Sequence, residues 1–258
     1  MANKIHSTAI ISKNAYLQDN ITIGPYVIIG DNVKIKSGTT IESFAQVLGY
    51  TEIGENCHIF QYAVIGNIPQ DLKYKGEKSF LIIGKNNRIR EFVTINPGTE
   101  KNSKTMIGNN NLIMAYSHIA HDCIIGDNNI LANSATLAGY VEIENNVVIG
   151  GLVAVHQYCR VGSYSIIGGL SKVVQDIPPY SMCDGHPAKV RTINLVGLRR
   201  AKFPSEKINS LKKAFKILFF QNHPFEKAKE KIKEELEETE EIKKLLDFIS
   251  TSKRGITR

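Results

Sequence analysis

The sequence lacks the segments that would direct the chain into or across a membrane. Its first ten residues, MANKIHSTAI, have no apolar stretch behind a basic start, so they predict no secretory signal. No apolar run approaches the roughly 18 residues of a membrane-spanning helix. The 258 residues are 42% hydrophobic with mixed charge, which is typical of a globular protein. We therefore expect a cytoplasmic protein without stable membrane insertion.

Cysteine is also scarce, and no two cysteines have the CxxC spacing of zinc or redox sites. The four positions are Cys57, Cys123, Cys159 and Cys183. This spacing favours reduced, structural thiols over a metal site.

Acidic residues are outnumbered only in the last part of the chain. From residue 186 onward there are 18 Lys and Arg against 10 Asp and Glu, whereas residues 1–185 contain 14 against 15. A basic surface attracts an anionic partner, which can be nucleic acid, a membrane surface, a phosphorylated ligand or an acidic protein. A solvated helical surface would explain the same excess.

Aliphatic residues recur every six positions over about two thirds of the chain. Of the 29 positions from Ile5 to Val173 in one phase, 26 are Ile, Leu or Val, and the exceptions are Asp71, Glu77 and Lys101. Neither a helix nor an ordinary strand has this period, which is typical of hexapeptide repeats. The residue two places earlier is often small or β-branched, and Cys57, Cys123 and Cys159 fall there. We expect these three thiols in the core.

The repeat predicts a mainly β fold, a left-handed parallel β-helix of triangular section with three hexads per coil. Glycine often follows the aliphatic residue directly, and we expect it there because tight turns need backbone freedom. Residues 67–80 and 97–105 are polar and interrupt the six-residue pattern. They are either binding loops or tolerated surface insertions. From about Asn194 the spacing becomes helical, and Ile232, Leu236 and Ile242 continue it. We predict a β-helix over residues 1–190 and a helical domain over 191–258.

Three histidines fall outside both inward positions of the repeat. These are His118, His121 and His156, and with 18 residues per coil His121, Gly139 and Gln157 should stack in one column. Asp122 follows His121 directly, and neighbours on a strand face apart, so the pair is poor metal geometry. We predict no metal. A neutral imidazole is suited to removing a proton from a hydroxyl, so a general base is the better role.

Seven motifs in this order resemble the acyl-ACP:UDP-N-acetylglucosamine O-acyltransferases of lipid A synthesis. They are IPQDLKYKGE (68–77), NRIREFVTI (87–95), HIAHDC (118–123), ILANSATLAGY (130–140), AVHQYCRVG (154–162), QDIPPY (175–180) and NLVGLRRAKF (194–203). Hexads alone are shared by many acyltransferases and by some proteins that are not enzymes. The resemblance covers the whole chain.

The resemblance implies a homotrimer that transfers a 3-hydroxyacyl chain from acyl carrier protein to the 3-position of UDP-N-acetylglucosamine, the first step of lipid A synthesis. It implies no cofactor beyond the phosphopantetheine of the carrier, and no nucleic acid. His121 matches the general base and the Gly139 N–H matches the oxyanion donor. Gly169 matches the position that measures acyl length. The implied substrate-binding residues are Asp71, Lys73, His118, His156, Gln157, Asn194 and Arg200.

The sequence departs from the family pattern at several positions, which leaves the acceptor open. Tyr140 stands where a histidine is usual, Val196 where a glutamate is usual, His186-Pro187 replaces Asn-His, and Asn96-Pro97 stands where some members have His-Arg. Acyl transfer to the 3-amino analogue of the sugar is the alternative. A related N-acyltransferase that acts later carries an extra N-terminal domain, for which hexads beginning at Ile5 leave no room. The alternative hypothesis outside the enzymes is a non-catalytic scaffold with a basic tail.

Overall fold

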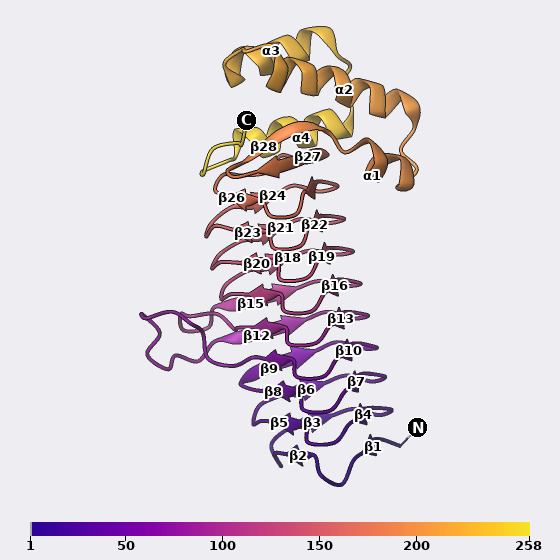
Figure 1. The fold of residues 1–258 in the computed structure, drawn as a ribbon, viewed down its shortest axis with the longest axis vertical. Helices are drawn as coiled ribbons and strands as arrows, with labels where there is room; N and C mark the ends of the chain where they lie inside the picture. The colour runs from indigo at the N-terminus through magenta and orange to yellow at the C-terminus, as the bar shows by residue number, and fades with distance from the viewer. Residues whose placement is uncertain (1) are drawn as a thin grey trace.

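The computed structural model describes residues 2–258, which form a rod of stacked coils with helices at one end (Figure 1). Each coil contributes one short strand to each of three sheets, and strands of successive coils pair in parallel. The repeat of six therefore builds a left-handed parallel β-helix, as predicted.

We name the sheets A, B and C. Sheet A contains β1 (Lys4–Ile5), β4 (Thr22–Ile23), β7 (Thr40–Ile41), β10 (His58–Ile59), β13 (Arg88–Ile89), β16 (Leu112–Ile113), β19 (Ile130–Leu131), β22 (Val148–Ile149), β25 (Ile166–Ile167), β27 (Ser181–Gly185) and β28 (Ala188–Ile193). Sheet B contains β2 (Ile10–Ile11), β5 (Ile28–Ile29), β8 (Gln46–Val47), β11 (Val64–Ile65), β14 (Thr94–Ile95), β17 (His118–Ile119), β20 (Thr136–Leu137), β23 (Ala154–Val155) and β26 (Lys172–Val173). Sheet C contains β3 (Tyr16–Leu17), β6 (Lys34–Ile35), β9 (Tyr50–Ile53), β12 (Phe80–Ile83), β15 (Lys104–Ile107), β18 (Ile124–Ile125), β21 (Glu142–Ile143) and β24 (Arg160–Val161).

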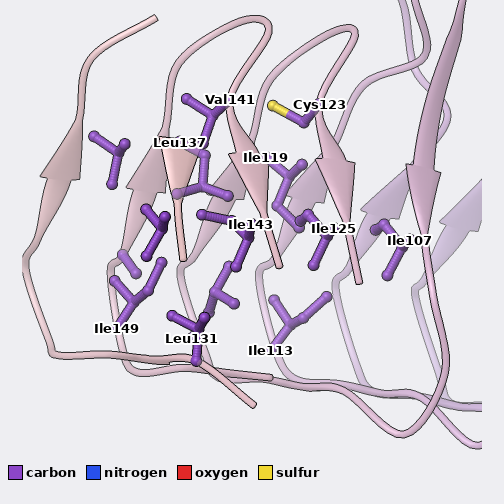
Figure 2. Close-up of a cluster of buried hydrophobic side chains, with 14 of the residues drawn as sticks. Ile107, Ile113, Ile119, Cys123, Ile125, Leu131, Leu137, Val141, Ile143 and Ile149 are labelled. Carbon is purple, nitrogen blue, oxygen red and sulfur yellow. The ribbon is translucent and has the colours of Figure 1, made fainter. Parts of the chain in front are cut away.

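The core is a column of aliphatic side chains inside the coils. Ile119, Leu137 and Val155 stack on one another in sheet B, and each is at most 2% exposed. Figure 2 shows such side chains, together with Cys123, filling the interior. Burial of each large aliphatic side chain contributes about 1.5–3 kcal/mol, so the column supplies most of the stability of the rod.

Three of the four thiols lie where the register predicts them, whereas the sequence left the state of Cys183 open. Cys57, Cys123 and Cys159 are buried at the small inward position, and Cys183 is buried in β27. Burial raises the pKa of the Cys123 thiol to about 12, so this thiol stays protonated at neutral pH.

The prediction for the turn glycines is wrong except at Gly66, which follows Ile65 and has a φ of +80°. Positive φ falls on the third residue after the inward aliphatic, and side chains such as Tyr26, Asn32 and Asp122 occupy that position. Glycine is needed instead because adjacent coils approach closely. A Cβ on Gly54 would lie 2.5 Å from the carbonyl carbon of Gly84 in the next coil, so a larger residue would push the coils apart.

Two insertions leave the corner between sheets B and C, and Figure 1 shows them projecting from the side of the rod. They occupy residues 67–79 and 97–103. His58 pairs with Arg88, and Thr94 pairs with His118, so stacked partners here are 30 and 24 residues apart instead of 18. Both insertions add whole multiples of six residues, which is why the aliphatic phase survives them.

The chain after the last coil closes the end of the rod. β27 and β28 form an antiparallel hairpin on sheet A. The helices α1 (Leu195–Arg200), α2 (Ser205–Phe220), α3 (Phe225–Glu235) and α4 (Glu240–Ser250) follow. The helical pattern does not run through Leu236 as predicted, because that residue is extended and Thr239 caps α4. The predicted boundary after residue 190 lies within β28, and the division into two domains stays a prediction.

The last residues return to the rod. The Asp176 N–H donates to the Gly255 carbonyl at 2.8 Å, and the Asp176 carboxylate accepts from Arg160 N and Ser252 Oγ. Because packed elements cover this end, its strand edges are shielded from pairing with other chains. Within residues 2–258, no helix is long and apolar enough to cross a membrane.

Candidate active site

The candidate site is a cleft at the corner between sheets B and C. His121 lies in the turn between β17 and β18, and the two inserted loops start from neighbouring coils at this corner. The cleft has a volume of about 820 Å³. It is lined by Gln70, Asp71, Leu72, Lys73, Glu77, Thr99, Glu100, Lys101, His121, Tyr140, Gln157 and Tyr158.

His121 and Asp122 point toward each other, contrary to the prediction from strand geometry. The pair lies in a turn, where Asp122 has a φ of +58°, so the alternation of a strand does not apply. The His121 Nδ1 lies 3.0 Å from the Asp122 Oδ2. A carboxylate accepts hydrogen bonds, so the imidazole donates from Nδ1 and its Nε2 carries the free lone pair.

Asp122 is held in its ionised form by the 97–103 loop. Its Oδ2 accepts hydrogen bonds from the Thr99 N–H at 3.0 Å and the Thr99 hydroxyl at 2.7 Å. Burial alone would raise the pKa of Asp122, but hydrogen bonds from Ser103, Thr99 and His121 outweigh it and lower the pKa below its ordinary value. A fixed negative charge therefore lies behind the imidazole.

The Nε2 side of His121 faces the first inserted loop. Asp71 Oδ2 lies 3.7 Å from Nε2, which is too long for a direct hydrogen bond. The loop itself is tied down, because Asn96 Nδ2 donates to the carbonyls of Asn67 and Ile68 at 3.1 and 3.2 Å. Asn96 thus holds the base of the loop that carries Asp71.

Gly139 lies directly beneath the imidazole. A Cβ on Gly139 would be 2.6 Å from Nε2 and 3.1 Å from Nδ1 of His121, so only glycine leaves room for the ring. The predicted column is present, because Tyr140 N donates to the His121 carbonyl and Tyr158 N to the Gly139 carbonyl. Gly139 is buried, and within residues 2–258 its N–H donates no hydrogen bond.

Tyr140 forms the wall of the cleft next to the histidine. Its ring is perpendicular to that of His121 at 5.4 Å between centroids and stacks on Tyr158 at 4.8 Å. Its hydroxyl lies 3.4 Å from Thr99 Oγ1. If Tyr140 accepted from Thr99 in that contact, the pKa of Tyr140 would fall, but burial and the negative charges of Asp122 and Glu100 outweigh this and raise it. The phenol is therefore a neutral donor at neutral pH.

The other two histidines predicted for the site, His118 and His156, flank it without lining the cleft. His118 lies on β17 with Nδ1 2.7 Å from Thr94 Oγ1. Burial, and then the proximity of His121, lower the pKa of His118, so it is neutral at neutral pH. His156 is exposed, and its Nδ1 lies 3.2 Å from the Arg254 guanidinium of the C-terminal segment.

The chain matches known proteins in both sequence and structure. Residues 176–257 match the model of domain 2 of UDP N-acetylglucosamine O-acyltransferase, and residues 104–139 match the bacterial transferase hexapeptide repeats. The acyl-(acyl-carrier-protein)–UDP-N-acetylglucosamine O-acyltransferase of Thermodesulfovibrio yellowstonii is 53% identical over 99% of this chain and all of its own length. The chain belongs to this O-acyltransferase family.

Solved O-acyltransferases have the same architecture along the whole chain. The structure from Acinetobacter baumannii has a TM-score of 0.95 at 45% identity and covers 98% of this chain and 99% of its own. That from Bacteroides fragilis has a TM-score of 0.96 at 42% identity and covers 98% and 100%.

Three of the residues matched to the O-acyltransferase pattern lie away from the His121 cleft in this chain. Asn194 is 8% exposed and caps α1, with Oδ1 accepting from Gly197 N and Nδ2 donating to the Tyr164 carbonyl. Arg200 is exposed at the end of α1. Gly169 is exposed at the corner between sheets A and B. The cleft of one chain combines Asp71, Lys73, His121 and Gln157, with Gly139 beneath.

The sequence reasoning missed Thr99 and Tyr158 of this O-acyltransferase. Thr99 lies in a polar inserted segment, yet it is only 7% exposed. The polar composition of the segment identified it as an insertion. No sequence pattern distinguished Thr99 within it, because its hydrogen-bond partner Asp122 is 23 residues away.

No three His, Cys, Asp or Glu side chains among residues 2–258 are grouped as metal ligands would be. The expectation that the O-acyltransferase needs no cofactor beyond the carried phosphopantetheine stays a prediction.

Proposed function

We propose that the protein transfers an (R)-3-hydroxyacyl chain from acyl carrier protein to the 3-hydroxyl of UDP-N-acetylglucosamine, the first step of lipid A biosynthesis. Relatives with about half of their residues identical carry the name of this acyl transfer. The observation that carries the proposal is His121, whose Nε2 faces the cleft while Nδ1 donates to an ionised carboxylate.

The chemistry follows from this arrangement. His121 Nε2 accepts the proton of the sugar 3-hydroxyl while the oxygen attacks the thioester carbonyl carbon. The positive imidazolium is stabilised by Asp122, and the Gly139 N–H donates to the developing oxyanion. When the tetrahedral intermediate collapses, the C–S bond breaks and the carrier thiolate takes the proton from Nε2. The products are the sugar ester and the free thiol, and the base is regenerated.

The loop of residues 67–79 supplies the binding groups nearest to the base. Asp71 is placed to accept a hydrogen bond from a sugar hydroxyl, and its Oδ1 is fixed by the Lys73 N–H at 2.8 Å. Lys73 is exposed at the rim, where its charge can meet a phosphate. Gln157 lines the opposite wall, and His118 and His156 flank it.

A second copy of the chain is part of the proposal. Asn194 is bonded to Tyr164, at the corner between sheets C and A, whereas His121 lies at the corner between sheets B and C. A rigid triangular rod cannot bring Asn194 and Arg200 to its own cleft. We therefore propose that a neighbouring copy in a homotrimer supplies them to the nucleotide.

The basic C-terminal part fits the anionic substrates. Residues 186–258 contain 18 Lys and Arg against 10 Asp and Glu. This excess would attract the diphosphate and an acidic carrier protein and would raise the association rate at low salt. The cytoplasmic location expected from the sequence stays a prediction.

Replacing the base tests the proposal. We expect His121→Asn to lower kcat for acyl transfer by at least about 100-fold, since general base catalysis contributes about 10²–10⁴. The matched control is His6→Asn, on the exposed N-terminal coil, which should keep parental kcat. Near-parental turnover of His121→Asn would rule out this base.

The acceptor is decided in the same assay. UDP-N-acetylglucosamine and its 3-amino analogue are compared as acceptors, each with acyl donors of several lengths. Faster transfer to the 3-amino sugar would show that the natural product is an amide and not an ester. A scaffold would acylate neither sugar and would gain no thermal stability from UDP-N-acetylglucosamine, whereas a binding enzyme is stabilised by its ligand.

A further inference from the structure

The 97–103 loop contacts the candidate catalytic pair through Thr99, and a further hydrogen bond from Ser103 reaches Asp122. Thr99 donates both its N–H and its hydroxyl to Asp122 Oδ2, the same oxygen that accepts from His121 Nδ1. Gly98 permits this approach, because a Cβ there would lie 2.7 Å from Asp122 Oδ1. Thr99 and the Asp122 side chain are 7% and 6% exposed, so water cannot readily replace these bonds.

The directions of the hydrogen bonds follow from the number of protons available. The Thr99 hydroxyl has one proton, and at 2.7 Å an ionised Asp122 can only accept it. The Tyr140 hydroxyl, 3.4 Å from Thr99 Oγ1, must therefore be the donor in that long contact. The result is a directed chain from Tyr140 through Thr99 to Asp122, which His121 joins from the other side.

We propose that Thr99 is a positioning residue, which holds Asp122 so that His121 keeps its proton on Nδ1 and presents Nε2 to the acceptor hydroxyl. Tyr140 supports this arrangement from the cleft side, through its hydroxyl on Thr99 and its ring against the imidazole. The role in turnover rests on the proposed function of His121 as the base.

A mainly structural role for Thr99 would look different. The hydroxyl of Thr39, for comparison, is fully buried and donates to the Gly54 carbonyl at 2.9 Å, a backbone group of the rod. The side-chain and backbone donors of Thr99 both go to one oxygen of Asp122, the carboxylate that holds His121. Loss of the Thr99 hydroxyl should therefore affect the imidazole before it affects the fold.

The test uses Thr99→Val, which removes the hydroxyl but keeps the shape and the N–H, with Thr99→Ser as the conservative variant. We expect Thr99→Val to lower kcat about tenfold with little change in KM for the sugar nucleotide, because a displaced base costs rate and not binding. Thr99→Ser should restore kcat. Thr39→Val controls for the loss of a buried threonine hydroxyl and should lower thermal stability without lowering kcat.

A second readout does not depend on activity. Nitrogen-15 NMR of histidine-labelled protein should show His121 with its proton on Nδ1 in the parent and Thr99→Ser, and a mixture of tautomers in Thr99→Val. An unchanged tautomer in Thr99→Val would overturn the proposal, and so would a loss of kcat that serine does not restore. If His121→Asn retained activity while Thr99→Val still changed the tautomer, the proposed base would fail and the positioning contact would stand.

Discussion

Replacing Gly139 by alanine tests whether His121 reacts from the place that it occupies in this structure. The new methyl group would lie 2.6 Å from Nε2 and 3.1 Å from Nδ1, against about 3.5–4 Å for an ordinary contact. The ring must therefore move by about 1 Å, and a misplacement of that size costs about 100-fold in rate. The N–H at residue 139 remains, so the proposed oxyanion donor is not removed.

The stability cost should be small and specific. The atoms nearest to the added methyl all belong to His121, whose side chain is 14% exposed and can shift toward the cleft. We expect a loss of about 1 kcal/mol in unfolding free energy, at the low end for overpacking. In a His121→Ala background the methyl meets no imidazole, so the cost of Gly139→Ala should disappear, which a double-mutant cycle measures.

The assay is kcat for acyl transfer, with thermal unfolding in parallel. Gly30→Ala is the matched control, because its methyl would come closest to the flexible Leu48 side chain at 3.3 Å and would lie at ordinary contact distances of 3.5 and 3.6 Å from the backbone of Leu48 and Val47. It should keep parental kcat. Parental kcat in Gly139→Ala would refute the reasoning, since the base could not then depend on the observed ring position.

Two further predictions concern stability. Asn111 is 1% exposed, and its side chain donates from Nδ2 to Asn87 Oδ1 and accepts at Oδ1 from Asn129 N, whereas its backbone N–H bond to Asn87 would survive the substitution. Asn111→Ala should therefore lower the free energy of urea unfolding by about 2–4 kcal/mol, and a loss under about 0.5 kcal/mol would show that the two side-chain bonds are dispensable. Because the pKa of His118 is lowered in the folded protein, the unfolded chain takes up the His118 proton at a higher pH than the folded chain does. Thermal stability should therefore be complete above about pH 6.5 and should fall below it. The lowered pKa of Asp122 predicts a second loss of stability below about pH 3.8. Thermal scans against pH measure both, and His118→Gln should remove the first loss only.

The orientation of the side chains in the site was harder to predict from the sequence than the fold. The prediction that His121 and Asp122 face apart assumed strand geometry, whereas the corner places Asp122 at positive φ and turns its carboxylate toward the imidazole. The glycine prediction failed for a related reason. Turn conformation falls on the third residue after the aliphatic, while Gly54 is required by the next coil, which the local sequence does not contain.

The sequence by itself determined the rod, because a period of six is a property of consecutive residues and the inward positions need only be aliphatic or small. It also determined the burial of Cys57, Cys123 and Cys159 and, through its motifs, the family. Only the tertiary structure decided that Thr99 holds Asp122 and that Asn194 caps a helix away from the cleft of its own chain. The Thr99–Asp122 contact joins segments whose separation depends on an inserted loop, and the place of Asn194 relative to the cleft depends on how the coils stack. Hydrogen bonds also depend on atomic positions that no periodic pattern encodes.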